Sequence, residues 1–544
     1  MSVTYNPLTI YKGALIRLYL LYKHTAGLLI GGLIAYVRGL PPYRKRWFRS
    51  AVPRISAFFL KIFVKRELRK EPFEVQLRRR LELLGPTYVK LGQIMAIRED
   101  IFPEHITREL KQLLDRLPEV PFAVIGEIIE RSLKRPLKEL FLDIRREPLG
   151  SASIGQTHRA TTYHGKPVVI KVIKPGIRDT IMADIKLLQV LGRILEWLLP
   201  RYQPQVVINE FCRYTLKEVD LTFEADHAEI FAANFQSYPD VAFPRIYREL
   251  SSEDVLTMEF FDGFKPNTPE IFQLSDSDQQ KVIETGVGTI IKMLYEDGFF
   301  HADLHAGNLI ILPGPRIGFI DVGMVGRFDE TIRRHMFYYF YSLVNGDIEN
   351  TAKHLLAMAK VGVGGDIPGF KRAVTDLFRR YLLVSAHGNF SLAQLILASV
   401  SIGGRYRIFF PVEMTLMVKA LVTFEGVGQY LAPHLDIPTL SRKHIQAVYL
   451  RRYNPRHLFG ELMRNIPELI DTLVNLPQLA SDGSRSLEQF LAQGTPENPL
   501  TGIKSSLMSG AMVIAGVLAF VQGAHPLLWI GLFVSSVLFF LYGK

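Results

Sequence analysis

The stretch FHADLHAGNLIILPGPRIGFIDVG, residues 300–323, is the most informative part of the chain. Asp303 and Asn308 lie five residues apart, and Asp321 follows thirteen residues after Asn308. LIIL and RIGFI, separated by a Pro/Gly turn, predict two short strands with a polar residue at each loop end. An Asp can orient or deprotonate an attacking hydroxyl, while Asn and Asp oxygens can hold Mg²⁺ against phosphates. The spacing therefore favours phosphoryl chemistry.

Two other interpretations of the same stretch stay open. Asp, Asn and Gly between strands are commonly turn residues and nothing more. His301, Asp303 and His305 also suit a zinc site, because imidazole and carboxylate bind zinc.

The interval from Asp303 to Asn308, followed by the run 321–323 (DVG), matches the catalytic-loop and D-F-G pattern of protein kinases. A kinase-like interpretation requires a nucleotide-binding half upstream.

Composition and charge limit the class of protein. The 544 residues allow two or three domains; 48% of them are hydrophobic and the mean hydropathy is +0.13, which is high for a purely soluble protein. The lone cysteine, Cys212, excludes an internal disulfide. The net charge is +12, yet residues 1–80 hold 17 Lys and Arg and only 3 Glu, so the remainder is close to neutral. This local basicity indicates an anionic partner at one end and not a protein that coats nucleic acid.

The N-terminal region, 1–72, is expected to associate with a membrane. Its apolar run 26–37, AGLLIGGLIAYV, is too short to span a bilayer and lies too late for a cleaved signal peptide. In 44–70, Phe and Ile alternate with Lys and Arg, which predicts a basic amphipathic helix on an anionic lipid surface. A solvated basic face packed on the folded domain and nucleic-acid binding are the alternatives.

The nucleotide-binding half is expected between residues 73 and 262. Residues 73–140 predict helices, and 148–176 predict two strands around a turn at 164–165. Gly150, Ala152 and Gly155 have the spacing of a kinase Gly-rich loop, with alanine in the middle position. An alanine methyl would keep the backbone from closing tightly over phosphates.

VVIK, residues 168–171, follows this loop and places Lys171 where a kinase lysine contacts the α- and β-phosphates. The alternative, a plain hairpin with an exposed lysine, is disfavoured because loop, lysine and catalytic stretch occur in the kinase order. The helical region 178–235 offers Glu218, Asp220 and Glu224, one of which should pair with Lys171. The strand-rich piece 241–262 ends in VLTMEFFDG, which resembles a kinase hinge.

The second half of the chain is predicted to be mostly helical. Residues 268–297 and 329–478 have helical periodicity, and the charges of 329–478 are expected to form solvated faces. Residues 480–504 have the composition of a linker. The uncharged runs 505–522 and 526–542 predict a transmembrane helical hairpin with both ends cytoplasmic, since Lys504 and Lys544 flank it; a buried soluble hairpin is the alternative. The predicted domains are 1–72, 73–262 (N-lobe), 263–479 (C-lobe), 480–504 (linker) and 505–542 (hairpin).

Six motifs in order resemble the UbiB family of atypical protein-kinase-like proteins, of the ADCK/AarF type. They are KLGQ (90–93), GSAS (150–153), VVIK (168–171), EVD (218–220) with Glu224, HADLHAGN (301–308) and DVG (321–323). The resemblance implies an α+β, two-lobed protein-kinase-like fold with a helical N-terminal extension. It also implies ATP and Mg²⁺ as cofactors, and a role in ubiquinone or other prenyl-quinone metabolism.

The resemblance also assigns residues. Lys90 and Gln93 would lie over the nucleotide site near Glu218 and Asp220, and Glu224 would be the partner of Lys171. Asp303 and Lys171 would be catalytic, and Asn308 and Asp321 would bind metal. The residues expected to bind nucleotide are Leu149, Gly150, Ser151, Ala152, Ser153, Ile154, Gly155, Gln156, Thr157, Lys171, Glu224, Met258 and Glu259. The chain departs from the family pattern at Gly150, at Ala96 (usually Ser) and at His227 (commonly Asn).

The expected function is that of a membrane-anchored, ATP-binding kinase or ATPase on the cytoplasmic side of the inner membrane. Its partners would be anionic and prenyl-quinone lipids and quinone-biosynthesis enzymes. Two alternatives remain. A true protein kinase acting in trans is disfavoured by the Ala152 loop and by a helix at Lys90 that would occlude the site. A catalytically silent scaffold is disfavoured by the complete set of Lys171, Asp303, Asn308 and Asp321.

Overall fold

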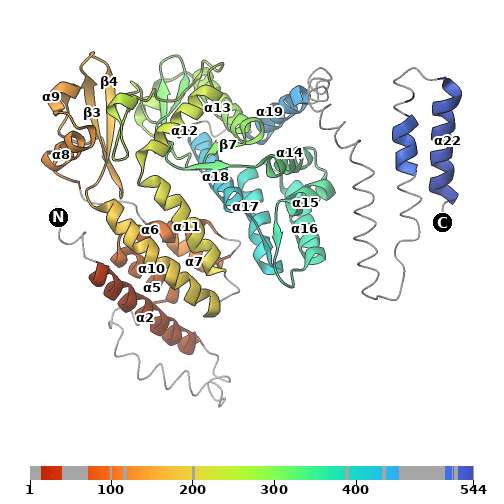
Figure 1. The fold of residues 1–544 in the computed structure, drawn as a ribbon, viewed down its shortest axis with the longest axis horizontal. Coiled ribbons are helices and arrows are strands. Elements are labelled where there is room, and N and C mark those ends of the chain that lie inside the picture. Colours follow the sequence, from red (N-terminus) through yellow and green to blue (C-terminus); the bar gives the residue numbers. More distant parts are fainter. Residues whose placement is uncertain are drawn as a thin grey trace. The chain divides into compact units, whose positions relative to one another are not determined.

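The chain forms two compact units, residues 1–451 and 452–544. The computed structural model describes residues 14–39, 71–98, 101–113, 119–198, 203–385, 391–431, 437–452, 509–516, 519 and 525–542. The predicted amphipathic helix over 44–70 and the predicted linker over 480–504 lie outside the described residues. The first unit contains an antiparallel sheet followed by a mostly helical half (Figure 1), which agrees with a two-lobed α+β fold.

The helices predicted for the N-terminal extension are present. The apolar run 26–37 lies within α2 (Ala14–Gly39), which packs against α5. Gly85, with φ +100°, separates α5 from α6, and Pro86 begins α6 because its missing N–H is not needed in a first helical turn. The helices that follow α2 are α5 (Phe73–Leu84), α6 (Pro86–Ile97), α7 (Glu104–Leu110), α8 (Phe122–Leu133) and α9 (Leu137–Leu140).

The N-lobe sheet has the strand order β1-β3-β4-β6, all antiparallel, with β2 paired to the end of β3. Its strands are β1 (Phe141–Ile144), β2 (Gly150–Ser151), β3 (Gly155–Thr162), β4 (Pro167–Ile173) and β6 (Val255–Glu259). The predicted turn between β3 and β4 contains Gly165 at φ +76°. In the β3–β4 pair, Lys171 lies opposite Thr157.

The alternation of side chains along β4 determines where Lys171 points. Val168, Ile170 and Val172 are fully buried and pack with Ile125 and Ile129 of α8 in the N-lobe core. Successive residues of a strand face opposite sides of the sheet. Lys171 therefore projects from the face opposite α8.

Three helices and two short connecting elements join the sheet to the second lobe. Helix α10 runs beside α11, and α12 contacts β6. Asp220 caps the N-terminus of α12 by accepting a hydrogen bond from the Thr222 N–H. The elements are α10 (Ile177–Leu198), α11 (Pro204–Glu218), α12 (Leu221–Asn234), β5 (Val241–Ala242) and the 3₁₀ turn η4 (Arg248–Leu250).

The central stretch 300–323 forms the loop, strand, turn and strand that its sequence predicts. Strand β8 pairs with β9 in antiparallel fashion, β5 joins β9 in parallel, and β7 pairs with β10. The elements of this half of the C-lobe are η5 (Pro269–Gln273), α13 (Asp276–Ile291), the π-helical turn η6 (Lys292–Asp297), β7 (Phe299–His301), η7 (Ala306–Asn308), β8 (Leu309–Leu312), β9 (Arg316–Phe319) and β10 (Val325–Arg327).

The remaining C-lobe is helical, and α18 lies at its centre. Most α18 side chains are buried, and the helix contacts α6, α13, α17, β7 and β10. The elements are α14 (Glu330–Val344), α15 (Ile348–Ala357), β11 (Lys360–Val361), α16 (Ile367–Ser385), α17 (Leu392–Gly403), η8 (Gly404–Tyr406), β12 (Ile408–Phe409), α18 (Val412–Leu431) and α19 (Ile437–Arg452). The predicted lobe boundary at residue 262 stays a prediction.

The prediction of a transmembrane hairpin over 505–542 is wrong. Among the helices of the described residues, none combines the length and the apolar composition needed to cross a bilayer. Helix α22 (Pro526–Tyr542) has 17 residues, which at 1.5 Å each give about 25 Å, against a hydrocarbon core of about 30 Å. Within this second unit, Ser509 and Ser536 hydrogen-bond to each other across the two predicted hairpin segments.

Candidate active site

Lys171 lies at the centre of a cluster of three charged side chains. Its Nζ is 2.8 and 2.7 Å from the two carboxylate oxygens of Glu224 in α12. The same Nζ lies 3.4 Å from Oδ2 of Asp321, which follows β9. Of the three carboxylates considered for Lys171, Glu224 is thus the one that contacts it. The cluster joins a strand and a helix of the first half to a loop of the C-lobe.

Burial and the neighbouring charges determine the protonation of this cluster. Burial opposes the charge on Lys171, but Asp321 and Glu224 outweigh it and raise the Lys171 pKa. Burial raises the pKa of Glu224 to about 7, against the effect of Lys171. Burial also disfavours the Asp321 anion, but Lys171 and the Gly323 N–H outweigh it and lower the Asp321 pKa to about 2. The Asp321 side chain is nevertheless 48% exposed. At neutral pH the cluster therefore presents a lysine cation beside an accessible aspartate anion.

The loop after β7 holds Asp303. The Asp303 N–H donates to Nδ1 of His301 over 3.0 Å, and Nδ2 of Asn308 donates to the Asp303 carbonyl over 3.0 Å. Burial lowers the pKa of His301 to about 4, so its imidazole is neutral and Nδ1 can accept this bond. The loop is thus shaped by its own His and Asn, and the Asp303 carboxylate is left partly accessible.

Backbone hydrogen bonds connect the Asp303 loop to the Asp321 loop. The Ala302 N–H donates to the Met324 carbonyl, and the Ile320 N–H donates to the Asn308 carbonyl, both over 3.0 Å. The Gly323 N–H donates to Oδ1 of Asp321 over 3.2 Å. These bonds fix the Asp303, Asn308 and Asp321 loops relative to one another.

Lys419 of α18 is a member of the site that the sequence did not indicate. Its Nζ donates to Oδ1 of Asp303 over 2.7 Å, and Nε2 of His305 lies 3.7 Å from Oδ2. The expectation that charges in 329–478 form only solvated faces is wrong for this residue. No local motif marks Lys419. It lies 116 positions after Asp303 in the sequence, and only the packing of α18 brings the two side chains together.

The predicted nucleotide loop lies at the edge of the sheet, next to Lys171. The Ala152 N–H donates to the Gly155 carbonyl over 2.9 Å, which closes the turn. A Cβ on Gly155 would lie 3.1 Å from the Val172 carbonyl oxygen, so glycine is favoured there by close backbone approach. Ser153 Oγ is buried and has no hydrogen-bond partner among the described atoms, so a phosphate oxygen at this point would satisfy it.

Other residues of the predicted nucleotide set have different positions. Leu149 and Gly150 are exposed, Ser151 is half-buried, Ile154 is buried, and the Thr157 hydroxyl donates to the Gly150 carbonyl. The Gln156 side chain is buried in two hydrogen bonds with the backbone of Val120, of 2.8 and 3.0 Å. Gln156 therefore fastens the sheet to the segment before α8.

The predicted hinge has fewer free backbone donors than expected. Met258 is buried, whereas Glu259 is exposed. The Glu259 N–H donates to the Arg245 carbonyl over 2.9 Å, and the Phe260 N–H donates to the Pro167 carbonyl over 3.2 Å. Both N–H groups are already used within the protein.

Within the family-specific set, the structure brings Lys90 and Glu218 together. Lys90 of α6 forms an ion pair with Glu218 at the end of α11. The Gln93 amide donates to the Leu113 carbonyl over 3.4 Å, while Asp220 caps α12. His227 stands where the family commonly has Asn, and its Nδ1 lies 3.1 Å from the Val322 carbonyl oxygen. Burial lowers the pKa of His227. A neutral His227 therefore donates to the backbone next to Asp321.

The donor set around Asp321 fits Mg²⁺. Asn308 uses its amide nitrogen on Asp303, which leaves its oxygen available, and Asp321 is an accessible anion. Mg²⁺ commonly takes one or two protein oxygens plus substrate phosphates. The zinc alternative finds no support: no group of three or more His, Cys, Asp or Glu side chains gathers as a metal site within the described residues.

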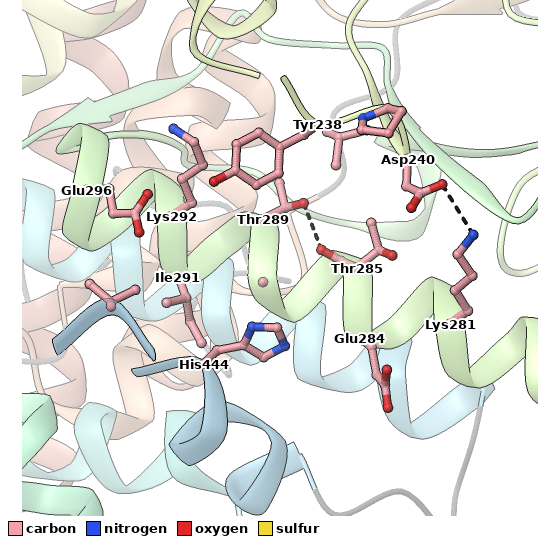
Figure 2. A pocket seen from close by; sticks show the side chains of 14 residues that line it. Tyr238, Asp240, Lys281, Glu284, Thr285, Thr289, Ile291, Lys292, Glu296 and His444 are labelled. Carbon is pink, nitrogen blue, oxygen red and sulfur yellow. Dashed lines mark hydrogen bonds and ion pairs between the residues drawn. The ribbon is translucent and has the colours of Figure 1, made fainter. Parts of the chain in front are cut away.

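Two hollows of several hundred Å³ lie outside this cluster. One, of about 370 Å³, is lined by α13, η6, α19 and the segment 238–241 (Figure 2). Its lysines are already paired, Lys281 with Asp240 at 3.3 Å and Lys292 with Asp297 at 2.5 Å. The other, of about 610 Å³, lies beside the hinge segment 259–262. Neither hollow is lined by Lys171, Glu224 or Asp321. The candidate site is therefore defined by the chemistry of these three residues and not by the size of a hollow.

Two family models match the chain. Residues 112–355 match the ABC1 atypical kinase-like domain, and residues 375–436 match the UbiB helical domain. The chain thus contains an ABC1 atypical kinase-like domain followed by a UbiB helical domain. The ABC1 match covers Lys171, Glu224, Asp303 and Asp321, whereas Lys419 lies in the UbiB helical domain.

Relatives named "Probable protein kinase UbiB" match over most of their length. The one from Xylella fastidiosa (strain 9a5c) is 29% identical over 447 residues, covering 80% of this chain and 79% of the relative. The one from Shewanella frigidimarina (strain NCIMB 400) is 28% identical over 506 residues, covering 89% and 90%. A solved structure, the complex of Rv3197 with erythromycin from Mycobacterium tuberculosis, is 22% identical and covers 67% of this chain and 93% of its own, with a TM-score of 0.47.

Proposed function

We propose that this chain binds Mg-ATP and transfers or hydrolyses its γ-phosphoryl group. The main observation in support is that Lys171 contacts both Glu224 and Asp321. These residues lie in the part of the chain that matches the ABC1 atypical kinase-like domain. A lysine held by a glutamate beside a metal-binding aspartate is the arrangement that kinases use for nucleotide phosphates. The free Ser153 hydroxyl and the accessible Asp321 carboxylate favour a phosphate ligand here.

Each residue has a distinct task in this proposal. Lys171 binds the α- and β-phosphates, and Glu224 holds its ammonium in place. Asp303 orients the attacking oxygen, of water or of an acceptor hydroxyl, and takes its proton. Asn308 and Asp321 hold Mg²⁺, which supplies positive charge against the phosphate oxygens.

The proposed cellular role is support of prenyl-quinone biosynthesis. Similarity to relatives named UbiB and the six family motifs support this role. Quinone-biosynthesis enzymes and prenyl-quinone intermediates would then be partners. The basic residues 1–80 support a further part of the proposal, contact with an anionic lipid surface on the cytoplasmic side of the inner membrane.

Phosphate release from Mg-ATP by the purified full-length chain tests the activity. We expect turnover that disappears in Asp303→Asn and rises with liposomes containing anionic lipid. Asp329→Asn, at a carboxylate that caps α14 instead of lining the site, is the control and should keep wild-type turnover. Tight ATP binding with equal, negligible release from wild type and Asp303→Asn would instead favour the catalytically silent scaffold.

A further inference from the structure

Asp303 and Lys419 form a contact between two separately matched domains. The Lys419 ammonium lies 2.7 Å from Oδ1 of Asp303, and the two side chains are 34% and 31% exposed. A surface ion pair of this kind contributes little to stability. Its partial exposure leaves both groups accessible to a ligand at the site.

The helix that carries Lys419 is held firmly in place. Its neighbours Val418 and Ala420 are buried. Phe424, five positions after Lys419, packs so closely against Gly286 of α13 that a Cβ added to Gly286 would lie 2.4 Å from the Phe424 ring. At the start of α18, Glu413 accepts a hydrogen bond from the Tyr214 hydroxyl over 3.2 Å. Packing on both sides therefore fixes the direction from which Lys419 reaches Asp303.

The catalytic loop itself has no permanent cation. HADLHAGN, 301–308, contains no Lys or Arg, and its His301 is buried and neutral. Phosphoryl transfer spreads negative charge over the group that is transferred, and in GTPases a positioned arginine cation increases the rate by several orders of magnitude. Lys171 is held by Glu224, and in the proposed function it binds the α- and β-phosphates, which stay on the nucleotide.

We propose that Lys419 is the cation that binds the transferring phosphoryl group, supplied by the helical domain and not by the catalytic loop. This inference rests on the proposed function. An oxygen activated by Asp303 lies within one hydrogen bond of its carboxylate and must approach phosphorus to about 3 to 3.5 Å. A cation already bonded to that carboxylate lies within reach of the same phosphoryl oxygens.

The step is a displacement at phosphorus. The attacking oxygen forms a bond to the γ-phosphorus while the bond from that phosphorus to the bridging oxygen breaks, and ADP leaves with the electron pair. The proton of the attacking water or hydroxyl passes to Asp303. Lys419 keeps its own protons throughout and stabilises the charge on the phosphoryl oxygens.

Nucleotide affinity tests the inference without requiring turnover. ATP carries the γ-phosphate and ADP lacks it, so Lys419→Met should weaken Mg-ATP binding about tenfold and change Mg-ADP binding less than twofold. Lys419→Arg, which keeps the charge, should restore most of the preference for ATP. Lys281→Met, which removes the Lys281–Asp240 pair in Figure 2, is the matched control and should change neither affinity.

The turnover of the same variants separates the possible outcomes. If wild type hydrolyses ATP, Lys419→Met should lower kcat about 100-fold or more, with KM changing much less. Unchanged ATP-over-ADP preference in a folded Lys419→Met protein overturns the inference and leaves the proposed function intact. Faster turnover in Lys419→Met also overturns it, because Lys419 would then block Asp303. Wild type that binds no nucleotide removes the proposed function and this inference together.

Discussion

Arg17 of α2 and Asp184 of α10 form an ion pair that is buried on both sides. Arg17 Nε lies 2.9 Å from Asp184 Oδ1, and the side chains are 9% and 1% exposed. Arg17→Met would leave the Asp184 carboxylate buried without its cation. We expect a loss of about 3 kcal/mol in unfolding free energy, measured as a lower urea midpoint.

The control for this prediction is the exposed pair of Arg108 and Glu104. Their side chains are 73% and 78% exposed, so Arg108→Met should change stability by less than about 0.5 kcal/mol. The double variant Arg17→Met with Asp184→Leu should recover part of the loss, because it removes both charges. Equal midpoints for Arg17→Met and Arg108→Met would show that the buried pair does not stabilise α2 against α10.

Asp321→Asn should weaken the dependence of nucleotide binding on Mg²⁺. The variant replaces an anion, whose pKa is lowered to about 2, by a neutral amide. We expect the gain in ATP affinity on adding Mg²⁺ to fall at least about tenfold, measured by calorimetry with and without EDTA. Asp240→Asn is the matched control, since Asp240 also lies 3.3 Å from a lysine but outside the site. An unchanged Mg²⁺ effect in Asp321→Asn would contradict the metal assignment.

His301 should make the folded state sensitive to acid. Burial lowers its pKa to about 4, whereas an unfolded histidine has a pKa of about 6.5. Between these values the unfolded chain binds the extra proton, so stability falls as the pH decreases from 6.5 towards 4. The full contribution is about 3 kcal/mol.

His301→Asn provides the measurement for this prediction. Its side-chain oxygen can replace Nδ1 as the acceptor of the Asp303 N–H, and it does not titrate in this range. Urea midpoints at pH 7.5 and pH 5 should differ less for the variant than for wild type. Parallel pH dependence in the two proteins would rule out His301 as the source.

Gly286→Ala tests whether close packing positions α18. The added Cβ would lie 2.4 Å from the Phe424 ring, which is buried and cannot move away freely. We expect a loss of about 1 to 3 kcal/mol in unfolding free energy together with reduced ATP turnover. Gly426→Ala, in α18 itself, meets no atom within 4 Å and should be neutral or stabilising by up to about 1 kcal/mol. Equal stability of the two variants would argue against the packing constraint.

Local patterns in the sequence were sufficient for much of the fold. The pattern of residues 148–176 predicted two strands around a turn at 164–165, and β3 and β4 form them, with Val168 and Ile170 buried. The spacing around Asp303 and Asp321 predicted two strands with polar loops, which β8 and β9 form. These features depend on neighbouring residues, so single-sequence periodicity captures them.

Features that depend on tertiary contacts could not be predicted in this way. The assignment of Gln156 to nucleotide binding stays a prediction, and the structure adds that its side-chain amide hydrogen-bonds to the backbone of Val120. The capping of α12 by Asp220 was likewise not predicted. Composition alone suggested a transmembrane hairpin, but α22 is shorter than such a span requires. Lys419 had no local signal, because only the packing of α18 brings it to Asp303.

The contact between Asp303 and Lys419 also crosses the boundary between the two family domains. The match to the ABC1 domain ends at residue 355, and the match to the UbiB helical domain begins at residue 375. A fragment cut at that boundary would keep Asp303 and Asp321 but lose Lys419. An exchange of either domain alone would therefore replace one partner of this contact, and engineered chimaeras keep it intact when α18 and the 301–308 loop come from the same parent.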